Sequence, residues 1–130
     1  RRVTDTPRRR ARSFGMEVIA HDAIVDAAFA ASWGVGYTSL EDLLARSDFI
    51  SLHAPSTPET RQMINRERLG RMKAGAFLLN TSRGELVDEA ALLEVLTENR
   101  IAGAAMDVGR APDQMPSPEL ARLANVIATP

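Results

Sequence analysis

Four short apolar segments of this sequence end in residues whose side chains could bind or orient a ligand. These groups, in chain order, are His21-Asp22, His53-Ala54-Pro55, Thr81-Ser82-Arg83-Gly84 and Asp107-Val108. If the segments are parallel strands, their carboxyl ends meet at one edge of a sheet, and ligands bind outside that edge. Two carboxylates and one arginine would then face the same edge. This predicted convergence indicates a binding site better than any one residue does.

Asp22 and Arg83 have the most specific chemistry in this set. In a dinucleotide-binding fold, a carboxylate at the position of Asp22 accepts hydrogen bonds from both adenosine ribose hydroxyls and repels a 2′-phosphate. The alternative is an ordinary turn aspartate. The guanidinium of Arg83 can hold a carboxylate by two parallel bonds, and Gly84 would let the backbone approach a ligand closely. The alternative is an arginine that pairs with Glu85 or Asp88 across the turn.

The elements that must position these residues alternate between strands and helices along the chain. Strands are predicted over 16–20, 48–54, 76–82, 101–108 and 124–130, and helices within 24–33, 66–72 and 117–123 and around 40–44 and 88–96. The strands are nearly continuous apolar runs, which is typical of strands covered on both faces by helical crossovers. The pattern therefore predicts an α/β fold with a doubly wound parallel sheet.

Helix starts are marked by capping residues in three places. Ser39 with Asp42 approximates a capping box, and Thr57-Pro58 predicts an N-cap followed by proline at the first helical position. Asp88 is expected to cap the helix whose buried stripe is Leu92, Leu93 and Leu96. The turn-rich stretch 109–118 is expected to be a functional or interface loop.

Length and composition limit the class of protein. The 130 residues suit about one domain, and 45% hydrophobic with 25% charged residues is ordinary for a globular chain. No apolar run approaches a membrane span, no signal peptide is recognisable, and the absence of cysteine fits a reducing cytoplasm. The net charge of -1 gives no attraction to nucleic acid. Six arginines in the first twelve residues could form a basic arm, but a solvated helix face is the preferred interpretation.

Three motifs in order carry a resemblance to a known family. The segments DFISLHAPSTPETRQMIN, MKAGAFLLNTSRGELVDEAALLEVL and IAGAAMDV resemble the NAD-binding domain of D-isomer-specific 2-hydroxyacid dehydrogenases, close to the phosphoglycerate dehydrogenase and hydroxypyruvate reductase branch. The resemblance covers about 14–130. It implies a Rossmann-like, three-layer αβα domain that here lacks its first strand, NAD as cofactor, a small 2-hydroxy or 2-keto acid substrate, and a homodimer in the full-length protein.

The resemblance also implies roles for individual residues. Asp22 matches the acid that holds the adenosine ribose, and Ala54 matches a position that touches the cofactor. Thr81 and Ser82 match residues along the nicotinamide, and Asp107 matches the acid near its carboxamide. Arg83 matches the catalytic arginine that orients the substrate's carboxylate and keto oxygen, beside the cofactor. No metal site is expected.

The sequence departs from the family pattern in three places. The last two glycines of G-x-G-x-x-G would fall at Arg1 and Thr4, so the diphosphate would be crowded. The glutamate that supports the catalytic histidine would fall at Pro112, with Asp113 as a possible substitute. That histidine would follow Pro130 directly, where this sequence stops. The chain therefore looks like an incomplete cofactor domain from a longer protein, without the substrate-binding domain and inactive alone.

Two functional hypotheses follow from these observations. One is the cofactor domain of an NAD-dependent oxidoreductase that moves a hydride between nicotinamide C4 and the C2 of a 2-hydroxy or 2-keto acid. The alternative is an NAD(H)-sensing, co-repressor-like relative that does not catalyse the reaction. Pro112 favours the second hypothesis and Arg83 favours the first. Arg1 and Thr4 also leave open a remnant that binds nothing.

Overall fold

The chain forms two compact units, Arg1–Leu43 and Leu44–Pro130, in the computed structural model. The structure describes residues 10–109 and 115–129. Helix α3 (Leu40–Arg46) crosses the division between the units. Its start is capped as predicted, because the Ser39 hydroxyl accepts the Asp42 N–H at 3.1 Å. The Asp42 carboxylate instead accepts a hydrogen bond from the Thr38 hydroxyl at 3.3 Å.

The first unit contains a parallel pair of short strands and one capped helix. Strand β1 (Ile19–Ala20) pairs with β2 (Gly36–Tyr37), and α2 (Ala27–Trp33) connects them. The Asp26 carboxylate accepts the Phe29 N–H at 2.9 Å, which begins α2, and a glycine with φ of 59° ends it. The sequence predicted a longer first strand and missed β2. Both strands are short because their pairing covers only two residues of each.

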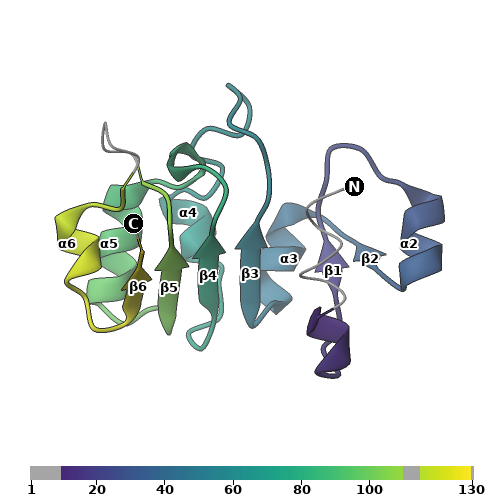
Figure 1. The fold of residues 1–130 in the computed structure, drawn as a ribbon, viewed down its shortest axis with the longest axis horizontal. Helices are drawn as coiled ribbons and strands as arrows, with labels where there is room; N and C mark the ends of the chain where they lie inside the picture. Colours follow the sequence, from purple (N-terminus) through teal and green to yellow (C-terminus); the bar gives the residue numbers. More distant parts are fainter. Residues whose placement is uncertain (1–9, 110–114, 130) are drawn as a thin grey trace. The chain divides into compact units, whose positions relative to one another are not determined.

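The second unit contains a four-stranded parallel sheet in the order β3-β4-β5-β6 (Figure 1). The strands are β3 (Phe49–Leu52), β4 (Phe77–Asn80), β5 (Gly103–Met106) and β6 (Val126–Ala128). The connections contain α4 (Arg66–Leu69), a 3-10 turn η1 (Gly84–Leu86), α5 (Glu89–Thr97) and α6 (Pro118–Ala121). The predicted α/β class and Rossmann-like parallel sheet are confirmed. Each strand is shorter than the apolar run that predicted it.

The two faces of this sheet differ in what covers them. Helices α4 and α5 lie on one side of the sheet (Figure 1). The strand residues buried on that side are Ile50, Leu52, Leu78, Ala104 and Met106. The opposite face carries Phe49, Phe77 and Ile127, which are exposed by 56%, 41% and 68%. A helical layer over this second face, expected for the three-layer arrangement, is not formed by the described residues of this unit.

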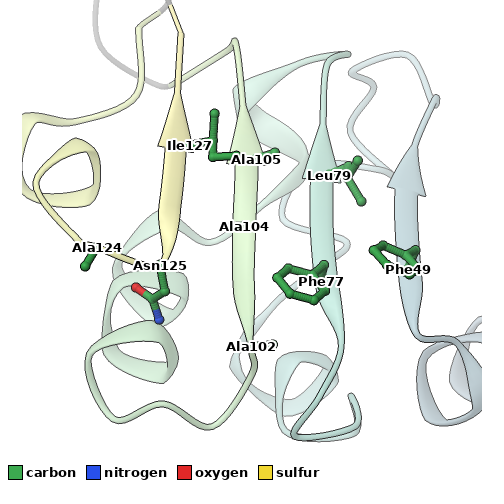
Figure 2. Close-up of a pocket in the computed structure, with 9 residues that line it drawn as sticks. All are labelled: Phe49, Phe77, Leu79, Ala102, Ala104, Ala105, Ala124, Asn125 and Ile127. Carbon is green, nitrogen blue, oxygen red and sulfur yellow. The ribbon is translucent and has the colours of Figure 1, made fainter.

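The exposed face is hollowed along the strands (Figure 2). The hollow measures about 350 Å³. Phe49 and Phe77 stack at one side of it, with ring centroids 5.4 Å apart, and Ile127 lines the other. Small alanine side chains form much of the lining between them. Along β3 and β4, buried residues therefore alternate with residues on the exposed face. The described residues of this unit bury the sheet on one face, whereas the sequence predicted strands covered on both faces.

The segment after Thr57-Pro58 is a turn, so the helix predicted there is wrong. The Arg61 N–H does bond to the Thr57 carbonyl at 2.9 Å, as in one helical turn. The next residue, Gln62, has a positive φ of 51°, and its N–H bonds at 2.7 Å to the Glu85 carbonyl instead. The helical pattern therefore ends after one turn, because the backbone at Gln62 bonds to the segment around Glu85 instead.

Helix α5 begins as predicted and buries a slightly different stripe. The Asp88 carboxylate accepts the Ala91 N–H at 3.1 Å. Leu92 and Leu96 are buried as expected, whereas Leu93 is half-buried. Ala91 and Val95 complete the buried face. The stripe therefore follows the i, i+3, i+4 spacing from Asp88, and Leu93 lies at its margin.

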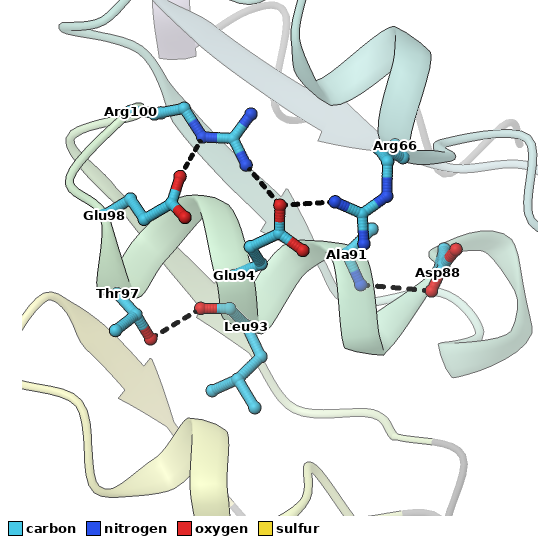
Figure 3. A network of polar contacts seen from close by, with 8 residues as sticks. All are labelled: Arg66, Asp88, Ala91, Leu93, Glu94, Thr97, Glu98 and Arg100. Carbon is cyan, nitrogen blue, oxygen red and sulfur yellow. Dashed lines mark hydrogen bonds and ion pairs between the residues drawn. The ribbon is translucent and has the colours of Figure 1, made fainter.

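An ion-pair network joins α4 to the exposed side of α5 (Figure 3). The Glu94 carboxylate accepts hydrogen bonds from the Arg66 guanidinium and, at 2.9 Å, from Arg100. Arg100 also lies 2.8 Å from the Glu98 carboxylate. The hydrogen bond from Arg66, then the positive charges of Arg66 and Arg100, lower the pKa of Glu94 below its ordinary value. The network therefore uses the charge of two arginines to hold α4 against α5.

In the part of the chain that the structure describes, no helix is long and apolar enough to cross a membrane.

Candidate functional site

The carboxyl ends of β3, β4, β5 and β6 lie next to one another at one edge of the sheet. Backbone pairing places Leu52 beside Asn80, Asn80 beside Met106, and Met106 beside Ala128. Each of these four residues is the last of its strand. The residues that follow them include Ala54, Thr81, Ser82, Arg83 and Asp107. The structure therefore brings these five predicted site residues of the second unit to a single edge.

A tight turn after β4 carries Ser82 and Arg83. The Asn80 side chain accepts the Ser82 N–H at 3.2 Å and donates to the Arg83 carbonyl at 2.9 Å. The Ser82 hydroxyl donates to the Leu52 carbonyl at the end of β3, at 2.9 Å. These three bonds tie the turn to two strands, while Thr81 and the Arg83 side chain remain exposed.

The Arg83 guanidinium has one described partner, the carbonyl of Ser82, to which Nη1 donates at 2.6 Å. Glu85 and Asp88, the acids considered as alternative partners, make other contacts. Glu85 accepts from the Ser56 hydroxyl and lies 3.7 Å from Arg61, and Asp88 caps α5. Among the residues that the structure describes, no ion pair joins Arg83 to either acid. Because a guanidinium has five N–H donors, most of its donors face solvent.

Gly84 is required by the protein's own backbone. A Cβ atom added at Gly84 would lie 2.2 Å from the carbonyl carbon and oxygen of Gly109, which follows β5. The sequence interpretation, in which this glycine lets the backbone approach a ligand, stays a prediction, and the structure adds a close neighbour within the protein. The close neighbour is the chain that follows Asp107. This contact holds the Arg83 turn directly against the end of β5.

The loop after β3 is joined to the same turn from the other side. Gln62 and Ile64 donate backbone hydrogen bonds to the carbonyls of Glu85 and Leu86, at 2.7 and 3.0 Å. The Ser56 hydroxyl donates to the Glu85 carboxylate. Sequence reasoning missed this second anchor, because nothing local indicates that Glu85 serves a loop about 30 residues earlier.

His53 and Ala54 follow β3 and are both half-buried. The Nε2 atom of His53 lies 2.9 Å from the Ser51 hydroxyl. Burial lowers the pKa of His53, because desolvation disfavours the imidazolium. A neutral, hydrogen-bonded imidazole fits the structural role that the sequence indicated. Ala54 presents only a methyl group at the edge.

Asp107 is the exposed acid of the edge. Its backbone N–H bonds to the Asn80 carbonyl at 3.3 Å, which fixes it beside the end of β4. No described side chain donates to its carboxylate. One carboxylate and one guanidinium therefore stand on neighbouring strand ends with most of their hydrogen-bonding capacity unused.

Asp22 belongs to the first unit and follows β1. It is exposed, and its carboxylate accepts the Ile24 N–H at 3.1 Å, which closes a local turn. Its neighbour His21 has Nδ1 3.2 Å from the Thr38 carbonyl. The predicted position at a strand end is observed. The convergence of Asp22 with Arg83 and Asp107 stays a prediction.

Several residues named from the sequence lie outside the described residues. They are Arg1, Thr4, Pro112, Asp113 and Pro130. Within the described ranges, no group of three or more histidine and acidic residues could hold a metal ion. The edge is therefore described by its arginine, its acid and its hydroxyls, a set suited to a ligand with carboxylate, keto or amide oxygens.

Comparison with known proteins identifies relatives of this arrangement. Residues 2–130 match the family model described as D-isomer specific 2-hydroxyacid dehydrogenase, NAD binding domain. A glyoxylate reductase from Korarchaeum cryptofilum is 48% identical over 122 residues, which are 94% of this chain and 37% of the relative. A D-3-phosphoglycerate dehydrogenase from Mycobacterium bovis is 43% identical over 129 residues, 99% of this chain and 24% of the relative. The chain thus spans about a quarter to a little over a third of these relatives.

Solved structures of similar fold include ligand complexes. The NAD-complexed D-isomer specific 2-hydroxyacid dehydrogenase from Lactobacillus delbrueckii ssp. bulgaricus has a TM-score of 0.83 at 33% identity, covering 96% of this chain and 42% of that one. D-lactate dehydrogenase from Aquifex aeolicus, complexed with NAD and lactic acid, has a TM-score of 0.81 at 35% identity, covering 92% and 40%. The motifs quoted from the sequence predicted the family whose model matches.

Proposed function

Because the chain belongs to the D-isomer specific 2-hydroxyacid dehydrogenase family, as its NAD-binding domain, we propose that it is the cofactor domain of a longer NAD-dependent oxidoreductase. The proposed reaction is hydride transfer between nicotinamide C4 and the C2 of a small 2-hydroxy or 2-keto acid. The chain alone is proposed to be inactive, because a substrate pocket needs residues beyond this sheet edge.

The observation that carries the proposal is the exposed Arg83 guanidinium at the same sheet edge as Asp107. Arg83 follows β4 and Asp107 follows β5, on paired strands. The free donors of the guanidinium suit a planar carboxylate and an adjacent keto oxygen. In that role Arg83 binds the substrate and stabilises negative charge that develops on the keto oxygen during reduction.

The chemistry of the edge also suits NAD. An amide such as nicotinamide carboxamide offers both a donor and an acceptor, and the edge offers the Asp107 carboxylate and the Thr81 hydroxyl. We assign Ala54, Thr81, Ser82 and Asp107 to the nicotinamide half, and the exposed Asp22 to the ribose of the adenosine half. When bound, NAD supplies or accepts the hydride. Arg83 and Asp107 then orient the two reactants.

The proton for the reduced oxygen is proposed to come from outside the described residues. General acid catalysis needs a donor within hydrogen-bond reach of the substrate oxygen. His53 is at the correct edge, but its pKa is lowered by burial and its Nε2 contacts Ser51. A neutral, engaged imidazole is a poor acid, so His53 is assigned to structure.

The first experiment is an NADH titration of this chain and of the full-length protein. Energy transfer from Trp33 to NADH and the shift in melting temperature report binding. We expect binding by the full-length protein, and millimolar NADH without any effect on it would contradict the cofactor assignment. The full-length protein is then assayed with glyoxylate, hydroxypyruvate, pyruvate and phosphohydroxypyruvate. NADH binding without turnover of any 2-keto acid would favour the NAD(H)-sensing relative.

The full-length protein is further proposed to act as a homodimer in the cytoplasm. The resemblance to the family supplies the reason for the dimer, and the absence of cysteine from this chain fits a reducing compartment. Light scattering coupled to size exclusion measures the mass directly. A monomeric mass at micromolar concentration would contradict the dimer.

A further inference from the structure

Asn80 is the one polar or charged side chain that is fully buried among the described residues. It is the last residue of β4, an inner strand of the sheet, and it pairs with Leu52 of β3 and Met106 of β5. An amide removed from water costs free energy unless its donors and acceptors are paired. An apolar residue would fill this place at lower cost, so the amide must have a compensating use.

The Asn80 amide joins the two ends of the turn that carries Arg83. Its Oδ1 accepts the Ser82 N–H at 3.2 Å, and its Nδ2 donates to the Arg83 carbonyl at 2.9 Å. Each bond goes to backbone, so the amide fixes the path of the chain on both sides of the Ser82–Arg83 peptide. The Asn80 backbone carbonyl also accepts the Asp107 N–H at 3.3 Å. One residue therefore contacts the backbone of both charged members of the edge.

The direction of the Arg83 side chain depends on this backbone path. Arg83 has extended backbone angles, φ of -146° and ψ of 132°, and its side chain leaves the turn into solvent. The turn cannot retreat, because Gly84 already lies against Gly109. With the amide removed, the Arg83 carbonyl would keep the Leu86 N–H at 3.3 Å, and the Ser82 hydroxyl would still reach the Leu52 carbonyl. Both side-chain bonds that tie the Ser82–Arg83 peptide to the end of β4 would be lost, which frees the backbone from which the guanidinium extends.

We propose that Asn80 is the positioning residue of Arg83: its buried amide sets the turn that aims the guanidinium at the substrate. This inference rests on the proposed function, in which Arg83 binds the carboxylate and keto oxygen of a 2-keto acid. Misplacing a reactive or binding group by about 1 Å can cost roughly 100-fold in rate. Replacing Asn80 should therefore lower the catalytic rate, because the Arg83 guanidinium is then misplaced.

The test is a double-mutant cycle in the full-length protein, with 2-keto acid reduction as the readout. The variants are Asn80→Asp, which replaces the Nδ2 donor by an acceptor facing the Arg83 carbonyl, Arg83→Ala, and the double variant. We expect Asn80→Asp to lower kcat/KM by roughly 10-fold to 100-fold. In the Arg83→Ala background the same change should have less than about a 3-fold effect. An equal loss in both backgrounds would overturn the proposal.

Two controls separate positioning from simple destabilisation. Leu78→Ala leaves a cavity on the same strand and buried face, two residues before Asn80. It should lower Tm while keeping kcat/KM at temperatures where the protein is folded. Asn80→Ser adds no charge and is too short to reach the Arg83 carbonyl, so it should repeat the catalytic loss of Asn80→Asp. If neither Asn80 variant folds, Asn80 serves folding alone and the proposal fails.

Failure of the proposed function would look different. Wild-type protein without activity on any 2-keto acid, or Arg83→Ala with full activity, would reject the role of Arg83 itself. Additive losses, with an Arg83→Ala variant that is much less active than wild type but still measurable, would reject only the link through Asn80.

Discussion

Arginines occupy two contrasting environments in the second unit. On the outer side of α5, Arg66 and Arg100 share the Glu94 carboxylate, and Arg100 also pairs with Glu98. At the sheet edge, the Arg83 guanidinium bonds only to the carbonyl of its neighbour Ser82 among the described residues, although Glu85 is two residues away. Glu85 is engaged by Ser56 and Arg61 instead.

The difference separates neutralised charge from available charge. In the Glu94 network, each guanidinium meets a carboxylate, so the cations are largely neutralised and little is left for a ligand. At the edge, other partners hold Glu85 and Asp88, and the Arg83 donors remain available. Exposed ion pairs contribute little to stability, whereas an available guanidinium at a strand edge can bind a carboxylate by two bonds. The predictions below test this separation.

The largest expected effect is on catalysis at Arg83. In the full-length protein, Arg83→Lys should lower kcat/KM for the 2-keto acid by roughly 100-fold to 1,000-fold, because a point charge cannot replace a two-pronged donor. Steady-state kinetics and thermal melting measure the two properties separately, and Tm should hardly change. Arg66→Lys is the matched control from the network and should leave kinetics unaltered. Unchanged kinetics in Arg83→Lys would remove the contrast between the two arginine environments.

The second effect concerns the backbone contact behind Arg83. Gly84→Ala places a methyl group where the Gly109 carbonyl lies, 2.2 Å away, and should destabilise the protein by about 1–3 kcal/mol. Urea unfolding gives this free energy. Gly75→Ala is the control, because a Cβ there meets no atom within 4 Å. If both variants have equal stability, the turn is looser than the structure indicates.

The third effect tests whether Asp22 in the first unit belongs to the same site. Asp22→Ala should reduce the preference for NADH over NADPH by about tenfold, or ~1.4 kcal/mol, since the repulsion of a 2′-phosphate is lost. Dissociation constants for both cofactors in the full-length protein supply the ratio. Asp26→Asn is a suitable control, because its side-chain oxygen still caps α2. Equal cofactor preference in wild type and Asp22→Ala would exclude Asp22 from the ribose site.

The smallest effect is the pH response of the Glu94 network. Because the pKa of Glu94 is below its ordinary 4.5 in the folded protein, its contribution to stability is present above pH 4.5. It is lost as the pH falls through the lowered native value. Glu94→Gln should therefore reduce Tm slightly at neutral pH and flatten the decline of Tm under acid conditions. Glu67→Gln removes a single exposed pair with Arg71 and should change less. An unaltered acid profile in Glu94→Gln would show that the network contributes nothing measurable.

Much of the fold follows from local patterns. The apolar runs around β3, β4, β5 and β6 predicted parallel strands, and Asp88 and Ser39 predicted helix starts that are observed. Alternation along the chain predicted crossovers and, with them, a shared carboxyl edge. These features depend on neighbours in sequence, so they could be predicted without coordinates.

Other features depend on contacts between distant segments and could not be predicted. Thr57-Pro58 has the local signature of a helix start, but Gln62 bonds to Glu85 and ends the turn. Strand β2 exists only because it pairs with β1. The close contact of Gly84 with Gly109, 25 residues later, has no signal near Gly84 in the sequence.

The sequence by itself determined the family, the parallel sheet and the placement of Arg83 and Asp107 after neighbouring strands. Those properties follow from the order of the residues, because the carboxyl ends of parallel strands lie at the same edge of the sheet. Only the tertiary structure decided which charges are neutralised and which remain available. Glu85 is as near to Arg83 in sequence as Glu98 is to Arg100, yet one acid is held by a distant loop and the other pairs locally. Competition among partners is settled by distance in space, and that is why the chemistry of the edge required coordinates.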